Sequence, residues 1–88
     1  MLEVVEARYQ GGYSVWVRFN DGVAGVVDLS AALWGPVFEP LKDVKRFKRF
    51  EVSKLLHTLV WDNGADLAPE YLRQRLVNPT VPQSSLQQ

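Results

Sequence analysis

Hydrophobic and polar residues alternate most regularly over residues 13–19, which read Y-S-V-W-V-R-F. An extended strand points successive side chains to opposite sides, so this alternation predicts a strand with one buried face. The buried face is expected to carry Tyr13, Val15, Val17 and Phe19. The other face is expected to carry Ser14, Trp16 and Arg18.

Two further strands are predicted on either side of this one, over residues 3–9 and 23–29, where β-branched and polar residues are mixed. Gln10-Gly11-Gly12 separates the first strand from the second, and Asn20-Asp21-Gly22 separates the second from the third. Glycine tolerates the positive φ that tight turns require. Loops this short predict an antiparallel three-stranded meander.

The middle of the chain predicts shorter elements. Ser30 is expected to cap a short helical turn that Gly35-Pro36 ends. Asp43 is expected to cap another single turn that runs to Phe47. Further short strands are predicted over residues 49–53 and 58–61.

Residues 58–72, T-L-V-W-D-N-G-A-D-L-A-P-E-Y-L, combine the end of a strand, a sharp turn and the start of a helix. Asn63 and Gly64 are typical of the turn. Asp66 is expected to cap a helix that continues to about Leu76, with a proline in its first turn. A helix of about ten residues is too short to be stable alone in water, so we expect it to dock on the sheet.

These elements together predict an α+β fold, in which an antiparallel β-meander of three strands plus one or two further short strands packs with a short central helical turn and a C-terminal helix. A length of 88 residues suits one small domain. We place that domain at residues 1–76 and expect residues 77–88 to form a flexible polar tail.

Composition narrows the class of protein. Hydrophobic residues make up 47% of the chain, which is ordinary for a globular domain and too high for a disordered one. There is no cysteine, which excludes disulfides and thiolate chemistry. No apolar run approaches the roughly 18 residues of a membrane span, and the N-terminus lacks the pattern of a signal peptide. We therefore expect a cytoplasmic protein with no membrane partner.

Charge is distributed unevenly, although the net charge is zero. Residues 42–54 contain six basic and two acidic residues, so this segment is positive and the rest of the chain is negative. Its basic side chains, with Phe47 and Phe50 stacking on bases, are one candidate nucleic-acid surface. The alternative, which we favour, is a solvated face whose phenylalanines point into the core. The candidate contacts are Lys45, Arg46, Lys48 and Arg49.

Acidic residues around the sharp turn offer a weak metal hypothesis. Asp62, Asn63, Asp66 and Glu70 resemble part of a calcium loop, but their spacing does not fit the EF-hand loop. A structural turn at Asn63 and Gly64 with a helix cap at Asp66 explains them better. The single histidine, His57, has no nucleophile motif beside it. We therefore expect no catalytic residues, no metal, no cofactor and no enzymatic activity.

Trp16 is the unusual residue on the polar face of the predicted strand. A tryptophan there is either covered by a helix or exposed as a contact site, since tryptophan is enriched in interface hot spots. Trp16 and Arg18 are therefore the candidate partner interface.

The chain contains, in this order, the segments F-N-D-G (19–22), V-D-L (27–29) and W-D-N-G-A-D-L-A-P-E-Y-L (61–72). With these segments it resembles a small bacterial family known as domain of unknown function 2442. The resemblance covers roughly residues 2–74 and implies an α+β fold with an antiparallel sheet. It also implies genes paired with another small protein, in the manner of toxin–antitoxin or accessory modules, and it brings no catalytic residues. We therefore expect a protein–protein interaction or accessory, antitoxin-like module. Its partner would be the product of a neighbouring gene or a second copy; the alternative is a nucleic-acid-associated regulator that uses residues 42–54.

Overall fold

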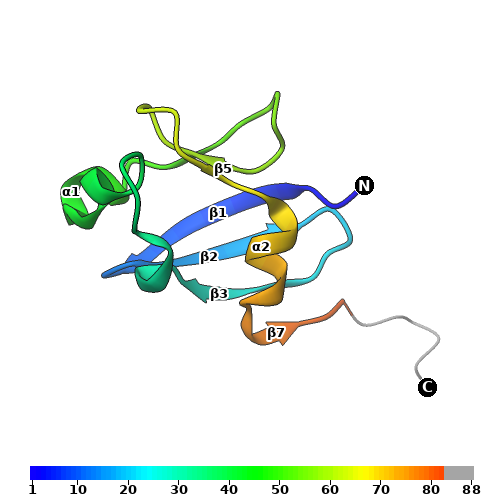
Figure 1. Ribbon diagram of the computed structural model, residues 1–88. Helices are drawn as coiled ribbons and strands as arrows, with labels where there is room; N and C mark the ends of the chain where they lie inside the picture. Colours follow the sequence, from blue (N-terminus) through cyan, green and yellow to red (C-terminus); the bar gives the residue numbers. More distant parts are fainter. Residues whose placement is uncertain (83–88) are drawn as a thin grey trace, which may run out of the picture.

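The computed structural model describes residues 1–82, and in this range the chain forms two antiparallel sheets and two short α-helices (Figure 1). The larger sheet has four strands in the order β1-β2-β3-β7. The meander predicted from the sequence makes up its first three strands, so the antiparallel α+β fold is confirmed. These strands are β1 (Val4–Gly11), β2 (Ser14–Phe19), β3 (Ala24–Asp28) and β7 (Val77–Thr80).

Strand β2 has the two faces that its alternation predicts. Val15, Val17 and Phe19 are each 0% exposed and face the core. Trp16 lies on the other face, opposite Arg8 of β1 and Val26 of β3. The sequence pattern therefore assigned the buried and open faces of the larger sheet correctly.

A second layer covers the buried face of the larger sheet. Figure 1 shows helix α2 crossing this face and the smaller sheet lying beside β1. The smaller sheet has the order β4-β5-β6 and only two residues in each strand. Its strands are β4 (Glu51–Val52), β5 (Leu59–Val60) and β6 (Asp66–Leu67), and the helices are α1 (Val44–Phe47) and α2 (Pro69–Gln74).

Two single turns of 3-10 helix complete this layer, η1 (Ser30–Ala32) and η2 (Glu39–Lys42). The predicted cap at Ser30 is wrong, because no side chain caps η1; instead Asp28 Oδ1 accepts a hydrogen bond from the Ser30 N–H at 2.9 Å. The predicted cap of α1 is confirmed. The Asp43 carboxylate accepts a hydrogen bond from the Lys45 N–H at 3.0 Å.

An aromatic cluster centred on Phe47 joins the two layers. The Phe47 ring is fully buried, and its centroid lies 5.3 Å from that of Tyr13, in the turn between β1 and β2, and 5.8 Å from that of Trp61, which directly follows β5. The Trp61 indole N–H donates to the Phe47 carbonyl at 2.8 Å. This buried hydrogen bond satisfies both groups away from water.

The last helix begins later than the sequence predicted. Asp66 lies in β6 opposite Val60, and the residue that precedes α2 is Ala68, which has no side-chain cap. The prediction that Asp66 caps this helix is therefore wrong. A residue before proline is disfavoured in the helical region, and Ala68 is extended with a ψ of 145°. Pro69 consequently fixes the start of the helix.

Residues 77–80 were predicted to belong to the tail but form strand β7 at the edge of the larger sheet. All four side chains are exposed, so no alternating pattern marked the strand. Pro79 is tolerated there because an edge strand has one side free of ladder hydrogen bonds. The larger sheet therefore continues past Leu76, and residues 83–88 of the predicted tail lie outside the described residues.

Strand β7 is expected to contribute measurably to stability. A chain that ends at Leu76 loses the pairing of β7 with β3, including Thr80 opposite the buried Ala24. Each lost backbone hydrogen bond contributes roughly 0.5–1.5 kcal/mol, so we expect a loss of about 1–3 kcal/mol in the free energy of unfolding. Urea denaturation should be compared with a chain that ends at Pro82. Equal stability of the two chains would show that β7 adds nothing.

Candidate contact surfaces

The open face of the larger sheet carries Trp16. Its indole is half-buried, and the Arg8 guanidinium lies 5.3 Å from the ring centroid. Helix α2 packs on the opposite face of the sheet, where Leu72 joins the core. Of the two alternatives for Trp16, cover by the last helix is therefore wrong.

Glu6 connects the cations of this face. Its carboxylate accepts hydrogen bonds from Arg8 Nη2 at 2.7 Å and from Arg18 Nη2 at 3.0 Å. The hydrogen bonds from Arg8 and then from Arg18 hold the pKa of Glu6 below its ordinary value of 4.5. Arg18, the second candidate interface residue, is thus already paired within the chain.

The open face also has a shallow groove beside Trp16, with a volume of about 430 Å³. Strand β7 forms its far wall, so the groove exists only because residues 77–80 join the sheet. Apolar and polar side chains alternate along it. They include Ser14, Trp16, Val26, Asp28, Val77 and Thr80.

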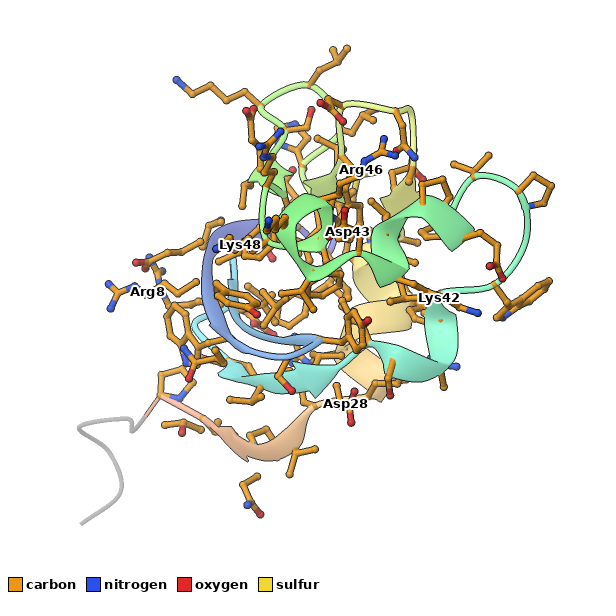
Figure 2. All side chains as sticks on the ribbon, turned by 90° about the vertical axis from the view of Figure 1, so that its left-hand side faces the viewer. Arg8, Asp28, Lys42, Asp43, Arg46 and Lys48 are labelled. Carbon is orange, nitrogen blue, oxygen red and sulfur yellow. The ribbon has the colours of Figure 1, made fainter. Side chains whose placement is uncertain are left out.

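The basic segment lies on and around α1. Figure 2 shows Arg46, Lys48 and Lys42 at separate places around α1 rather than gathered at one point. Lys42 pairs with Glu39 at 3.1 Å. The four candidate nucleic-acid contacts are exposed, and within residues 1–82 none forms an ion pair; they are Lys45, Arg46, Lys48 and Arg49.

The aromatic residues of this segment face inward. Phe47 is fully buried, and Phe50 packs against Phe47 and Trp61 with ring centroids 6.4 Å from each. They are therefore not placed to stack on bases. This arrangement agrees with the favoured alternative, a solvated basic face whose phenylalanines belong to the core.

The turn predicted at Asn63 and Gly64 is present. Gly64 has a φ of +92°, and Asn63 Oδ1 accepts a hydrogen bond from the Ala65 N–H at 3.1 Å. Asp62, Asp66 and Glu70 are exposed. In the part of the chain that the structure describes, no group of three or more His, Cys, Asp or Glu side chains gathers as a metal site.

A third surface, which the sequence did not reveal, is an apolar cleft between the loop 34–38 and the start of α2. Its volume is about 380 Å³. Trp34 at its edge is 73% exposed and Val37 is 46% exposed. The cleft is lined mainly by Trp34, Pro36, Val37, Phe38, Leu67 and Tyr71.

The turn at Asn63 and Gly64 holds the loop that forms this cleft in place. Asn63 Nδ2 donates to the Val37 carbonyl at 2.9 Å, across 26 positions of the chain. Phe38 packs edge-on against Trp61 at a centroid distance of 6.4 Å. The cleft is thus formed before any ligand binds, which lowers the entropic penalty of binding.

Comparison with known proteins gives one match. A family model described as "Protein of unknown function (DUF2442)" matches residues 4–77, from the start of β1 to the first residue of β7. No curated protein and no solved structure matches the chain. Among the described residues, no helix is both long enough and apolar enough to cross a membrane.

The carboxyl of Glu6 is expected to titrate below 4.5 in an NMR titration, because two guanidinium groups stabilise its charged form. Arg8→Gln should move the pKa toward 4.5 by more than Arg18→Gln, since the hydrogen bonds of Arg8 are the largest cause of its depression. Any stability that depends on these pairs is present above 4.5 and is lost as the pH falls through the lowered pKa. An unshifted pKa in the unmodified chain would contradict the observed pairing.

Asn63 is expected to position the loop that carries Trp34. Asn63→Ala removes both side-chain hydrogen bonds and should destabilise the protein by about 1–2 kcal/mol. Asn63→Asp keeps the acceptor for the Ala65 N–H but loses the donor to the Val37 carbonyl. Both variants should increase amide exchange at Gly35, Val37 and Phe38, as measured by NMR. If Asn63→Asp leaves this exchange unchanged, the bond to Val37 does not hold the loop.

Proposed function

The chain belongs to the DUF2442 family, and we propose that it is a protein-binding module whose main contact site is the apolar cleft beside Trp34. It holds a partner protein, as an accessory or antitoxin-like module does, and has no catalytic activity of its own. The partner is either the product of a neighbouring gene or a second copy of the chain.

The exposed indole of Trp34 is the observation that carries this proposal. It is 73% exposed at the edge of a cleft whose other walls are apolar. Removing apolar surface from water contributes about 25 cal/mol per Å², and tryptophan is enriched among residues that dominate binding energy. A partner side chain in the cleft would cover both Trp34 and Val37.

The open face with Trp16 and Arg18 is the second candidate contact surface. Arg8 stacks on Trp16, and Glu6 pairs with Arg18, so a partner at this face would have to displace or incorporate these contacts. In the cleft, the Arg75 guanidinium lies over the ring of Tyr71 at 3.5 Å from its centroid, but Trp34 itself has no such neighbour in the cation–π or aromatic contacts of residues 1–82. This difference is why we favour the cleft.

Nucleic-acid binding is the alternative function, and one observation favours it. Lys45, Arg46, Lys48 and Arg49 form no ion pairs within residues 1–82, so their charges are available to phosphates. Binding of this kind would weaken steeply with salt, since each phosphate contact releases counterions. Titration of duplex DNA at low and high salt separates this function from protein binding.

Two tryptophan variants test the proposal with the same chemical change at two surfaces. A tagged form of the chain first recovers the partner protein from the host. We then expect Trp34→Ala to weaken the affinity for that partner, measured by calorimetry, by about 30-fold or more, which is the effect of a hot-spot residue. Its melting temperature should change little because Trp34 is exposed.

Trp16→Ala is the matched control and should leave the affinity within a few-fold of the unmodified chain. A reversed result, with loss only in Trp16→Ala, would place the contact on the open face of the sheet. Unchanged affinity in both variants would overturn protein binding through either surface.

A further inference from the structure

The turn between β4 and β5 holds two leucines out in solvent. Leu55 is 84% exposed and Leu56 is 51% exposed. Their backbone N–H groups both donate to the Ser53 hydroxyl, at 3.1 Å and 2.9 Å. The leucines therefore stand on an ordered turn rather than on an unstructured loop.

Further hydrogen bonds fix this turn to the larger sheet. The His57 N–H donates to the Ser53 carbonyl at 2.8 Å, and the His57 carbonyl accepts from the Val4 N–H of β1 at 2.9 Å. His57 has a φ of +58°, which a non-glycine residue adopts only rarely. Because the turn is already ordered, a partner that binds the leucines has little backbone entropy to remove.

The leucine turn and the Trp34 cleft lie apart on the molecule. Figure 1 shows the loop before β5 on the opposite side from the loop that leads from η1 to α1. A chain therefore does not fill its own cleft with its own leucines. An apolar projection and an apolar cleft on different sides of one chain are the elements of a head-to-tail contact between copies.

Charges next to the two surfaces differ in sign. Lys54 directly precedes the leucines, and Glu70 directly precedes the cleft-lining residue Tyr71. Both side chains are exposed, and within residues 1–82 neither forms an ion pair. A lysine that arrives with the leucines would therefore bring a charge opposite to that of Glu70, whereas two copies of the leucine turn would bring lysines of like charge together.

We propose that the Lys54-Leu55-Leu56 turn of one copy docks in the Trp34 cleft of a second copy. This inference rests on the proposed function, because it takes the cleft as the contact site and names its occupant. The contact is heterologous, so copies add head to tail into short chains or close into a ring. A contact of this small size gives weak, concentration-dependent association.

Complementation between two variants tests the proposal by sedimentation velocity. Leu55→Ser removes the projection and keeps the cleft, while Trp34→Ala alters the cleft and keeps the projection. The unmodified chain should self-associate as its concentration rises toward about 1 mM, and each variant alone should stay monomeric. An equimolar mixture of the two variants should form a dimer and nothing larger, because it retains a single type of intact contact.

Val81→Ser is the control, since Val81 is exposed and lies outside both surfaces. This variant should self-associate like the unmodified chain. Lys54→Glu should weaken self-association without altering either apolar surface. Thermal melts followed by circular dichroism confirm that each variant is folded.

Three results overturn the proposal. A mixture that stays monomeric while the unmodified chain associates excludes this pairing of surfaces. If Leu55→Ser still self-associates and Trp34→Ala does not, the cleft remains the contact site but the leucine turn is excluded as its occupant. If the unmodified chain stays monomeric at all concentrations up to about 1 mM, self-docking is excluded. The affinity of the host partner for Trp34→Ala then tests the proposed function separately.

Discussion

The buried contact between Trp61 and Phe47 is the interaction on which the second layer depends. Helix α1 has four residues and each strand of the smaller sheet has two, so none of these elements is stable by itself. The indole N–H of Trp61 meets the Phe47 carbonyl at 2.8 Å, and the two rings pack at 5.8 Å. The same contact supports the Trp34 cleft, because Phe38 of that cleft packs edge-on against Trp61.

The sequence predicted the larger sheet well because its strands have contrasting faces. Val15 and Val17 lie under the second layer while Trp16 faces outward, so buried and outward-facing side chains alternate along the strand. The smaller sheet gave only a weak signal, since two residues cannot show a period. Strand β7 gave none, because all its side chains are exposed and its position is fixed by pairing with β3. The start of α2 was misplaced because Asp66 resembles a cap, although Pro69 restricts the residue before it.

Prediction of the candidate surfaces had a similar limit. Alternation placed Trp16 and Arg18 on the open face, but the stacking of Arg8 and the pairing through Glu6 depend on the register between β1 and β2. The Trp34 cleft was missed because its loop contains Gly35-Pro36 and has no regular pattern of hydrophobic and polar residues. Its shape depends on Asn63, which is distant in the sequence. Residues of the sharp turn therefore have a role in shaping a surface that their local spacing does not indicate.

The three tryptophans of the chain occupy three different environments, and this makes its intrinsic fluorescence unusually informative. Trp61 is buried in the aromatic cluster, Trp16 is half-buried under a guanidinium, and Trp34 stands in solvent. Emission from Trp34 should lie furthest to the red and be quenched most readily by acrylamide, whereas that from Trp61 should be shielded. Versions of the chain that keep one indole at a time would thus report separately on the integrity of the core, on the open face of the sheet and on occupation of the cleft, without any attached dye.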